Sequence, residues 1–440
     1  MDFSVSSRFI APARDGADSL SAKISSLARS LEELRLHVGP ADLVLGDLRM
    51  NAQLAFCLAN SCLRNRAVLL YGGIGANKTT LINLLGSSFL GSSFSAMENL
   101  MVTGHPEQTE EKVVGFIDPR QWTSPSRGPL EVIWSPWASS RWKLINEINR
   151  FPTGKQNLFL EILQKRKLTY AGQVIEPGDT CYFATMNPEF SSTYPMDEAL
   201  MDRISACVPA VQPDFLSGLT LSKREEEVGE LAEHLPRFSQ EEFEALPLAV
   251  AEVALDSATE LAIVSLVREM TVCERAPNRD KTQLSDSRPS RGLCAGCHYF
   301  NNPEVCCWQV DQGLSDRVRQ DLRSFTRAMS FLAKGKDGSK MEVLRAVAPY
   351  VLWHRLTPNR SVLERPPYYG ADRLAFVSDL VARSIDRTVH ERGEANLIFS
   401  RAVDKEISPA QAREELSQFD DPLVQLDYLP ALERLLRPDL

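Results

Sequence analysis

Apolar residues recur at helical spacing near the start of the chain and form short continuous runs further along. The spacing predicts one helix over residues 19–37, which Gly39-Pro40 ends, and another over residues 51–62. The continuous runs are typical of buried strands. They lie at residues 67–71, 142–146 and 180–185, and further helices are expected at residues 154–165 and 194–203.

Beyond Pro213 the pattern becomes helical and acidic. Ser239, followed by Glu242 three residues later, predicts the capped start of one helix. Other helices are expected at residues 223–233, 256–272, 317–335, 372–385, 408–416 and 423–436. The proline-rich residues 96–140 predict functional loops or small hairpins, and residues 167–175 predict a hairpin.

A glycine-rich turn connects the strand at residues 67–71 to a helix that begins near Lys78. Strand, glycine turn, Lys-Thr and helix, in this order, are typical of a phosphate-binding loop. Backbone N–H groups and the helix N-terminus would bind phosphate oxygens, Lys78 would reach the β- and γ-phosphates, and the Thr79 hydroxyl would bind Mg²⁺. The predicted nucleotide-binding residues are Gly72, Gly73, Gly75, Ala76, Asn77, Lys78, Thr79 and Thr80.

The loop departs from the pattern G-x-x-x-x-G-K-[ST] at Asn77, where the second glycine is expected. Asn is among the few residues that tolerate a left-handed backbone, so the loop can keep its shape. Taken alone, the stretch also fits an ordinary glycine turn between a strand and a helix. Motifs elsewhere in the chain are needed to distinguish a phosphate-binding loop from an ordinary turn.

The strand at residues 142–146 ends in Asn146 and is followed by Glu147. In phosphate-loop ATPases we expect this strand to lie beside the first, its terminal acid to hold Mg²⁺ through water, and the next glutamate to polarise the attacking water. Asn146 keeps an acceptor oxygen but lacks the charge, so Mg²⁺ should be held more weakly. The alternative is a strand with an exposed acidic end. Asn187, after the third strand, can bind the γ-phosphate or the attacking water.

The composition is that of an ordinary globular protein, with 43% hydrophobic and 24% charged residues in a chain of 440. The net charge of −9 argues against a dedicated nucleic-acid binder. No apolar stretch approaches the roughly 18 residues of a membrane span, and no secretory signal is visible. We therefore expect a cytoplasmic protein with reduced cysteines and no membrane partner.

Three longer stretches resemble the MoxR family of AAA+ ATPases. They are NEINRFPTGKQNLFLEIL at residues 146–163, FATMNPEFSSTYPMDEALMDRI at 183–204 and LRAVAPYVLWHRL at 344–356. Their order and spacing relative to Lys78 also fit, over roughly residues 41–360. The resemblance implies an α/β fold: a three-layer αβα AAA+ nucleotide-binding domain with a parallel sheet, followed by an all-α helical lid and a helical C-terminal extension.

The resemblance also sets the expected domain boundaries. These are an N-terminal helical segment (1–40), the nucleotide-binding domain (41–212), the helical lid (213–360) with a cysteine-rich insertion (273–312), and the C-terminal extension (361–440). The extension is either a docking surface or a plain helical cap.

By the same resemblance, Lys78 and Thr79 fall on the Walker A motif, and Asn146 and Glu147 fall on the Walker B motif. ATP and Mg²⁺ are therefore the expected cofactors, with Thr79 and Asn146 on the metal side, partly through water. Asn77 and Asn146 both depart from the family pattern. We expect these departures to slow turnover more than they weaken binding.

The remaining catalytic residues, besides Glu147, are also implied by the resemblance. Asn187 falls on sensor 1, Arg203 on the arginine finger that acts on the neighbouring subunit's nucleotide, and Arg317 on sensor 2 of the lid. An arginine supplied by a neighbour makes hydrolysis depend on a ring, and the resemblance implies a homo-hexamer. Arg150 is either a second residue facing the neighbour or a surface arginine at a helix end.

The cysteines of the insertion form a separate candidate site. Cys294, Cys297, Cys306 and Cys307 could bind structural zinc, with Cys273 or His298 as an alternative fourth ligand, since thiolates two residues apart suit one tetrahedral ion. The C-x-x-C-H pattern also marks haem attachment, for which a cytosolic ATPase gives no reason. The other alternative is a set of reduced cysteines in a packed loop.

The resemblance implies ATP hydrolysis coupled, in a chaperone-like role, to remodelling or maturation of a partner protein. Relatives often work with a von Willebrand factor A-type partner, so a protein client or partner is expected and nucleic acid is not. The alternative, motivated by Asn77 and Asn146, is a hydrolysis-impaired, nucleotide-gated scaffold or regulatory subunit. A nucleic-acid motor is disfavoured by the acidic balance.

Overall fold

The fold is described from a computed structural model of the chain. It divides into two compact units, Met1–Ala254 with Arg327–Gly338, and Leu255–Thr326 with Ser339–Leu440. The described residues are 14–34, 42–73, 75–120, 131–188, 193–211, 232–270, 309–312, 314–333, 338–368, 372–421 and 423–436.

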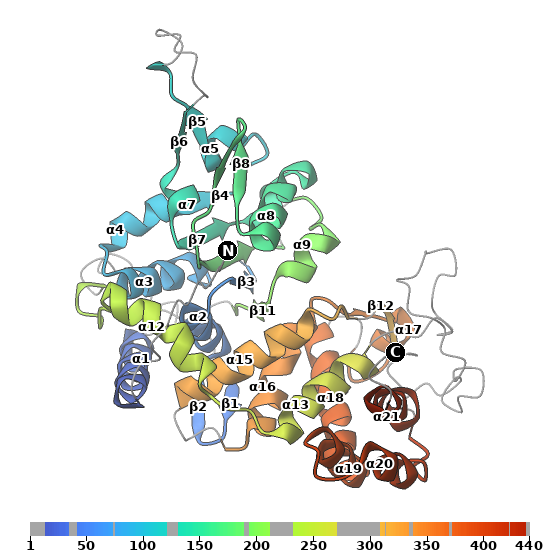
Figure 1. The fold of residues 1–440 in the computed structure, drawn as a ribbon. Helices are drawn as coiled ribbons and strands as arrows, with labels where there is room; N and C mark the ends of the chain where they lie inside the picture. Colours follow the sequence, from blue (N-terminus) through green and yellow to red (C-terminus); the bar gives the residue numbers. More distant parts are fainter. Residues whose placement is uncertain are drawn as a thin grey trace, which may run out of the picture. The chain divides into compact units, whose positions relative to one another are not determined.

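The first unit is built around a five-stranded sheet with the order β11-β3-β10-β7-β4 (Figure 1). Every neighbouring pair in it is parallel. The strands are β3 (Arg66–Tyr71), β4 (Met101–Thr103), β7 (Trp142–Asn146), β10 (Cys181–Met186) and β11 (Ala206–Pro209). The predicted α/β fold and the three predicted buried strands are confirmed.

The prediction that β3 and β7 lie next to each other in the sheet is wrong. We expected the strand ending at Asn146 to lie beside β3, but β10 lies between β3 and β7 and pairs with both. The first five residues of β10 are buried, as suits a central strand that both neighbours cover. Continuous apolar runs indicate burial on both faces and carry no signal for which strand lies next to which.

Two helices pack against this sheet, α2 (Ala52–Cys62) against β3 and β11, and α3 (Lys78–Leu90) against β10 and β7. Every residue of α2 is buried, and its first turn is capped by Asn51, whose side chain accepts the N–H of Leu54. The helix is mostly apolar, as its burial requires, and the buried Asn60 and Ser61 in its last turn are hydrogen-bonded to Tyr182 and Cys57.

A second pair of helices in this unit is α1 (Arg14–Leu34) and α12 (Gln240–Ala251). Lys23 of α1 donates to Glu242 of α12 at 2.6 Å. Glu242 also accepts the N–H of Ser239, whose hydroxyl accepts the N–H of Glu242 in return. The predicted capped start of this helix is therefore confirmed as a capping box.

Short hairpins lie between the strands of the sheet in sequence. The hairpin β8–β9 (Leu168–Tyr170, Gln173–Ile175) confirms the prediction for residues 167–175, and β5–β6 (Gly115–Ile117, Val132–Trp134) lies in the proline-rich region. A third hairpin, β1–β2 (Leu43–Leu45, Leu48–Met50), was not predicted.

Lys143 is an unexpected residue inside β7, because its side chain is fully buried. Its Nζ donates to the carbonyl oxygens of Trp137 and Ala138, the latter at 2.8 Å. These bonds tie β7 to the short helix α7 (Pro136–Ser139). Burial lowers the pKa of Lys143 to about 7, since water no longer stabilises its charge.

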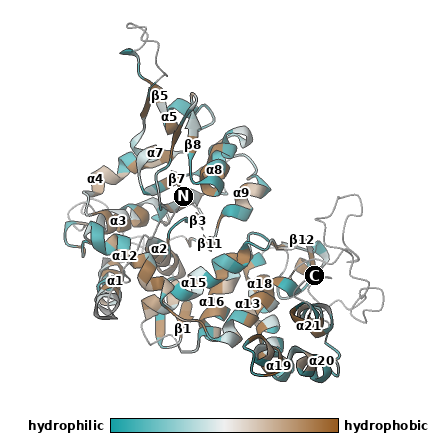
Figure 2. Ribbon diagram, in the orientation of Figure 1, coloured by the Kyte–Doolittle hydropathy of each residue, from teal (hydrophilic) through white to brown (hydrophobic). Residues whose placement is uncertain are grey.

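The second unit is helical. Its helices are α13 (Ser257–Glu269), the start of α15 (Val318–Ala333), α16 (Lys340–Leu352), α17 (Arg360–Leu363), α18 (Arg373–Asp386), α19 (Gly393–Val403), α20 (Pro409–Leu416) and α21 (Leu429–Leu436). They are amphipathic, as Figure 2 shows, and α18 illustrates this by burying Phe376, Val377, Leu380 and Val381. Strands β12 (Val310–Gln312) and β13 (Thr357–Pro358) form a small antiparallel pair.

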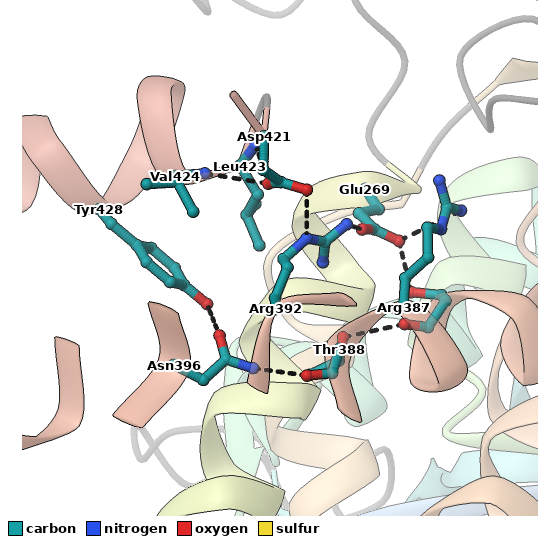
Figure 3. A network of polar contacts seen from close by, with 10 residues as sticks. Glu269, Arg387, Thr388, Arg392, Asn396, Asp421, Leu423, Val424 and Tyr428 are labelled. Carbon is teal, nitrogen blue, oxygen red and sulfur yellow. Dashed lines mark hydrogen bonds and ion pairs between the residues drawn. The ribbon is translucent and has the colours of Figure 1, made fainter. Parts of the chain in front are cut away.

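A polar network connects α13 to the last helices (Figure 3). Arg392 donates to Glu269 at the end of α13 and to Asp421 before α21, the latter at 2.7 Å. Ser384 of α18 donates to Glu269 at 2.5 Å. Helices before and after residue 361 are therefore joined by buried polar contacts within one unit.

Some predictions fall outside the described residues. These are most of the helix at 223–233 and residues 273–308 of the cysteine-rich insertion 273–312, with all of its candidate zinc ligands. Within the part of the chain that is described, no helix is long and apolar enough to cross a membrane.

Candidate nucleotide-binding site

The predicted phosphate loop lies between β3 and α3. Gly72, directly after β3, donates its N–H to the carbonyl oxygen of Met186 at 3.1 Å. A Cβ atom on Gly72 would lie 2.1 Å from the Ala210 carbonyl oxygen, so the close approach of the chain after β11 requires glycine here. Asn77 has φ 46° and ψ 28°, the left-handed conformation predicted for it. The turn therefore keeps its shape without the second glycine.

Lys78 is the first residue of α3, and its side chain folds back over the loop. Its Nζ donates to the carbonyl oxygens of Gly72 at 2.7 Å and Gly73 at 2.6 Å. The N–H groups of the first helical turn lie at the same place, and the helix dipole favours an anion there. A phosphate oxygen is a charged acceptor and binds an ammonium group more strongly than a carbonyl does. The Lys78 ammonium group can thus leave these two carbonyl oxygens and bind a phosphate oxygen instead.

A cluster of polar side chains lies where α3, β7 and β10 meet. The Asn146 side-chain oxygen accepts two hydrogen bonds, from the Thr79 hydroxyl at 3.0 Å and from the Thr185 hydroxyl at 2.7 Å. Because the carboxyl ends of parallel strands meet at one edge of the sheet, Asn146 and Thr185 are brought to the loop side. The structure therefore joins the predicted Walker A threonine to the predicted Walker B asparagine.

Glu147 follows directly and is held at two points. Its backbone is left-handed, with φ 53° and ψ 51°, and its N–H donates to the Thr185 hydroxyl at 2.9 Å. Its carboxylate accepts a hydrogen bond from Arg150 at 2.7 Å. About a quarter of each side chain is exposed, at 27% for Arg150 and 22% for Glu147. Arg150 thus has a partner that neither sequence-based alternative included.

Thr185 is a site residue that the sequence analysis missed. It is the last buried residue of β10 and bonds to both Asn146 and Glu147. Sequence reasoning assigned the strand end to Asn187 instead. A threonine that follows apolar residues at the end of a strand is the signal that could have identified it, because the buried hydroxyl requires a partner.

The other predicted catalytic residues have local partners of their own. Asn187 is 3% exposed, and its carbonyl oxygen accepts from the Asn149 side chain at 2.8 Å. Arg203 ends α9 (Glu198–Arg203) and pairs with Asp202 at 3.0 Å. Arg317 belongs to the second unit, where it is exposed just before α15. The catalytic roles of these residues remain predictions.

The donor set around Thr79 fits Mg²⁺ only partly. Thr79 and Asn146 offer neutral oxygens, and the nearest acid in sequence, Glu147, is paired with Arg150. Magnesium prefers oxygen ligands and is commonly held by one or two protein groups together with phosphates and water. Thr79 and Asn146 would therefore hold the ion only with the negative charge that a bound nucleotide supplies.

The zinc hypothesis stays untested, because its cysteines lie outside the described residues. Across the described stretches, no group of three or more His, Cys, Asp or Glu residues is arranged to hold a metal ion. Four cysteines of the first unit, Cys57, Cys62, Cys181 and Cys207, are free and buried. Burial raises the thiol pKa values of the first three, so these thiols stay protonated.

The chain is similar in sequence to two curated proteins. The chain is 25% identical to Chaperone MoxR1 of Mycobacterium tuberculosis over 344 residues, which is 78% of each protein. It is 29% identical over 128 residues to the uncharacterized protein YeaC of Bacillus subtilis, covering 29% of this chain and 40% of that one. No family model matches the chain.

A solved structure supports the fold. The crystal structure of a candidate ATPase from Cytophaga hutchinsonii superposes with a TM-score of 0.60 at 20% identity, over 84% of this chain and 97% of that one. This comparison confirms the predicted α/β fold with its helical C-terminal region, and the sequence comparison confirms the family resemblance inferred from the motifs.

Proposed function

Since the chain resembles the MoxR family of AAA+ ATPases, we propose that it binds ATP with Mg²⁺ and hydrolyses the nucleotide. The observation that carries this proposal is the junction of Thr79, Asn146 and Thr185 beside the Lys78 loop. These side chains come from three separate elements, and all lie at the edge of the sheet where phosphate-loop proteins bind nucleotides. An ordinary glycine turn would not require such a polar junction.

In this proposal the residues share the work of phosphoryl transfer. The loop N–H groups and Lys78 bind the phosphates, and Thr79 and Asn146 hold the metal side, where Mg²⁺ would neutralise developing charge. Glu147 orients the attacking water and draws its proton. Asn187 contacts the γ-phosphate or that water, and Arg203 and Arg317 add positive charge, Arg203 from the neighbouring subunit.

We further propose that the chain works as a homo-hexameric ring in the cytoplasm and remodels or matures a partner protein. The similarity to a protein named as a chaperone supports this class of work. A von Willebrand factor A-type protein is the partner that the family resemblance favours. The net charge of −9 disfavours nucleic acid.

The test of this proposal is phosphate release from ATP by purified protein, measured with and without Mg²⁺, alongside nucleotide affinity. We expect Lys78→Ala to weaken ATP binding roughly 10- to 100-fold, because a charge-assisted hydrogen bond contributes about 1.5–3 kcal/mol. Phosphate release should fall at least as far. Lys165→Ala is the matched control, since Lys165 pairs with Glu161 on the surface of α8 (Thr153–Lys165) and should leave both values unchanged. Equal ATP affinity of Lys78→Ala and wild type would contradict the assignment of the loop.

The rival function is a nucleotide-gated scaffold that does not hydrolyse ATP. Asn146 motivates it, because its neutral oxygen accepts the Thr79 hydrogen bond where the family has a carboxylate. We expect Asn146→Asp to tighten Mg²⁺ binding to the nucleotide complex about tenfold, the effect of roughly 1.4 kcal/mol of added charge attraction. Fluorescent-nucleotide titrations at varied Mg²⁺ measure this directly. If the Mg²⁺ dependence is the same in both proteins, position 146 does not lie on the metal.

A further inference from the structure

Gln156 is a fully buried amide that uses both ends of its side chain. It lies in α8 (Thr153–Lys165) and is 0% exposed. Its side-chain oxygen accepts the N–H of Asp197 at 2.9 Å, and its nitrogen donates to the carbonyl oxygens of Pro195 at 3.2 Å and Phe151 at 3.1 Å. Gln156 therefore binds the segment that leads into α9.

That segment fixes the start of the helix that carries Arg203. Asp197 is the N-cap of α9, and its side chain accepts the N–H of Leu200 at 3.1 Å. Of the six residues of α9, all of them described, Leu200 is the one that is buried. A helix this short with one buried residue has little apolar packing to orient it. Its direction depends on the polar contacts at its start.

Asn149 is a second buried amide with the same kind of partner. It is 1% exposed and lies in the turn η2 (Ile148–Arg150), which begins directly after Glu147. Its side chain donates to the carbonyl oxygen of Asn187 at 2.8 Å, and its own carbonyl oxygen accepts the N–H of Tyr194 at 2.7 Å. Asn149 thus joins the turn after the acid to the segment before α9.

The side-chain contacts of Gln156 with Pro195 and Asp197, and of Asn149 with Asn187, require amide groups. A buried polar side chain stabilises a fold only when it is hydrogen-bonded, and an apolar residue of equal size would fill the space at no such cost. Residues 194–197 are held at successive points, at Tyr194 by the main-chain carbonyl oxygen of Asn149 and at Pro195 and Asp197 by the Gln156 side chain. A movement of the Glu147 turn would therefore be transmitted to the start of α9.

We propose that Gln156 and Asn149 are positioning residues for Arg203, which couple the Glu147 turn of one site to the arginine offered to the next. This inference rests on the proposed function, in which Arg203 serves the neighbouring subunit. In this inference the two residues link the nucleotide sites of neighbouring subunits, in addition to packing within their own subunit. Arg203 itself is 15% exposed in its side chain and paired with Asp202, so its orientation is defined within the subunit.

A mixing experiment with two inactive variants tests the proposal. Glu147→Gln subunits keep Arg203 but lack the acid, and Arg203→Ala subunits keep the acid but lack the arginine. Mixed in one ring, they should regain phosphate release, because some acid-bearing sites receive an arginine from a Glu147→Gln neighbour. If wild type hydrolyses ATP and this mixture does not, the role of Arg203 between subunits fails, which is a failure of the proposed function.

Gln156→Met is then added to either partner of the mixture. In the Glu147→Gln donor it should lower phosphate release at least tenfold, because the donated Arg203 is no longer held in position. In the Arg203→Ala recipient it should have less than a twofold effect, because that subunit donates no arginine. A merely structural role would impair both mixtures equally, and that result would overturn the proposal, as would full activity with the doubly substituted donor.

Asn60→Leu in the donor is the matched control. Asn60 is also fully buried in the first unit, and its side chain donates to the carbonyl oxygen of Tyr182 at 2.9 Å, away from α9. The donor with Asn60→Leu should keep the activity of the mixture. Loss of activity with both buried-amide variants would attribute the effect to general destabilisation and overturn the proposal.

Discussion

Replacing Glu147 by Gln should lower kcat for ATP hydrolysis by about 100- to 1000-fold, within the range that a general base contributes. The amide keeps the size of the side chain but cannot take up the proton of the attacking water. Nucleotide affinity should change less than about threefold, because Glu147 follows β7 and is not part of the phosphate loop. Its backbone N–H bond to Thr185 does not depend on the side chain, so the turn should persist.

Steady-state phosphate release and fluorescent-nucleotide binding measure the two effects separately. Glu161→Gln is the matched control, since Glu161 is an α8 carboxylate paired with Lys165 at 3.3 Å, and it should behave as wild type. If Glu147→Gln binds ATP and releases phosphate as fast as wild type, the enzymatic proposal fails and the scaffold explanation replaces it.

The ion pair of Glu147 with Arg150 bears on the basal rate. One carboxylate oxygen accepts from the guanidinium group at 2.7 Å, so one of its lone pairs is not available to an attacking water. Arg150 therefore holds the acid in place, and the neutral Asn146 beside it adds to the expectation of slow turnover.

The order of the chemical motifs could be predicted from sequence because each is local. The left-handed backbone of Asn77 follows from its place before Lys78 in a glycine-rich turn, and the structure confirms it. The strand end at Asn146 follows from where its apolar run stops. The contacts between the motifs needed the fold, because α3, β7 and β10 come together only through the order of strands in the sheet.

That order could not be read from the sequence alone. The runs at β3, β7 and β10 are similar in length and polarity, so each fits any central position. The burial of Lys143 could not be predicted either, because a lysine inside an apolar run gives no sign that it will bond to two carbonyl oxygens of α7. These features arise from tertiary packing and leave no periodic pattern.

In the second unit, the contacts between Glu269, Arg392 and Asp421 were missed for a similar reason. The residues are far apart in sequence, and each alone fits a solvated helix end. In the structure Arg392 is 4% exposed and donates to both carboxylates (Figure 3). Burial lowers the pKa of Arg392, but the two carboxylates raise it by more, so the guanidinium group remains charged.

Replacing Arg392 by Met should lower the free energy of unfolding of the second unit by about 3–5 kcal/mol, as expected when one partner of a buried ion pair is removed. Glu269 and Asp421 would then be buried as carboxylates without their shared cation. Chemical denaturation of the full chain, followed by far-UV circular dichroism, measures the shift. Adding Glu269→Gln to Arg392→Met should recover part of the lost unfolding free energy, because it removes one of the two carboxylates that no longer have Arg392 beside them.

Arg387→Met is the control that distinguishes the loss of a buried ion pair from the loss of a more exposed one. Arg387 also pairs with Glu269, but at 3.6 Å and with 25% of its side chain exposed, so its loss should cost less than about 1 kcal/mol. If Arg392→Met costs as little as Arg387→Met, the network does not hold the unit together. If it costs the full amount and the whole helical unit unfolds in one transition, α13 and the helices after residue 361 form one folding unit. The C-terminal helices would then act as part of the lid, because the buried charge of Arg392 can be balanced only while Glu269 and Asp421 remain beside it.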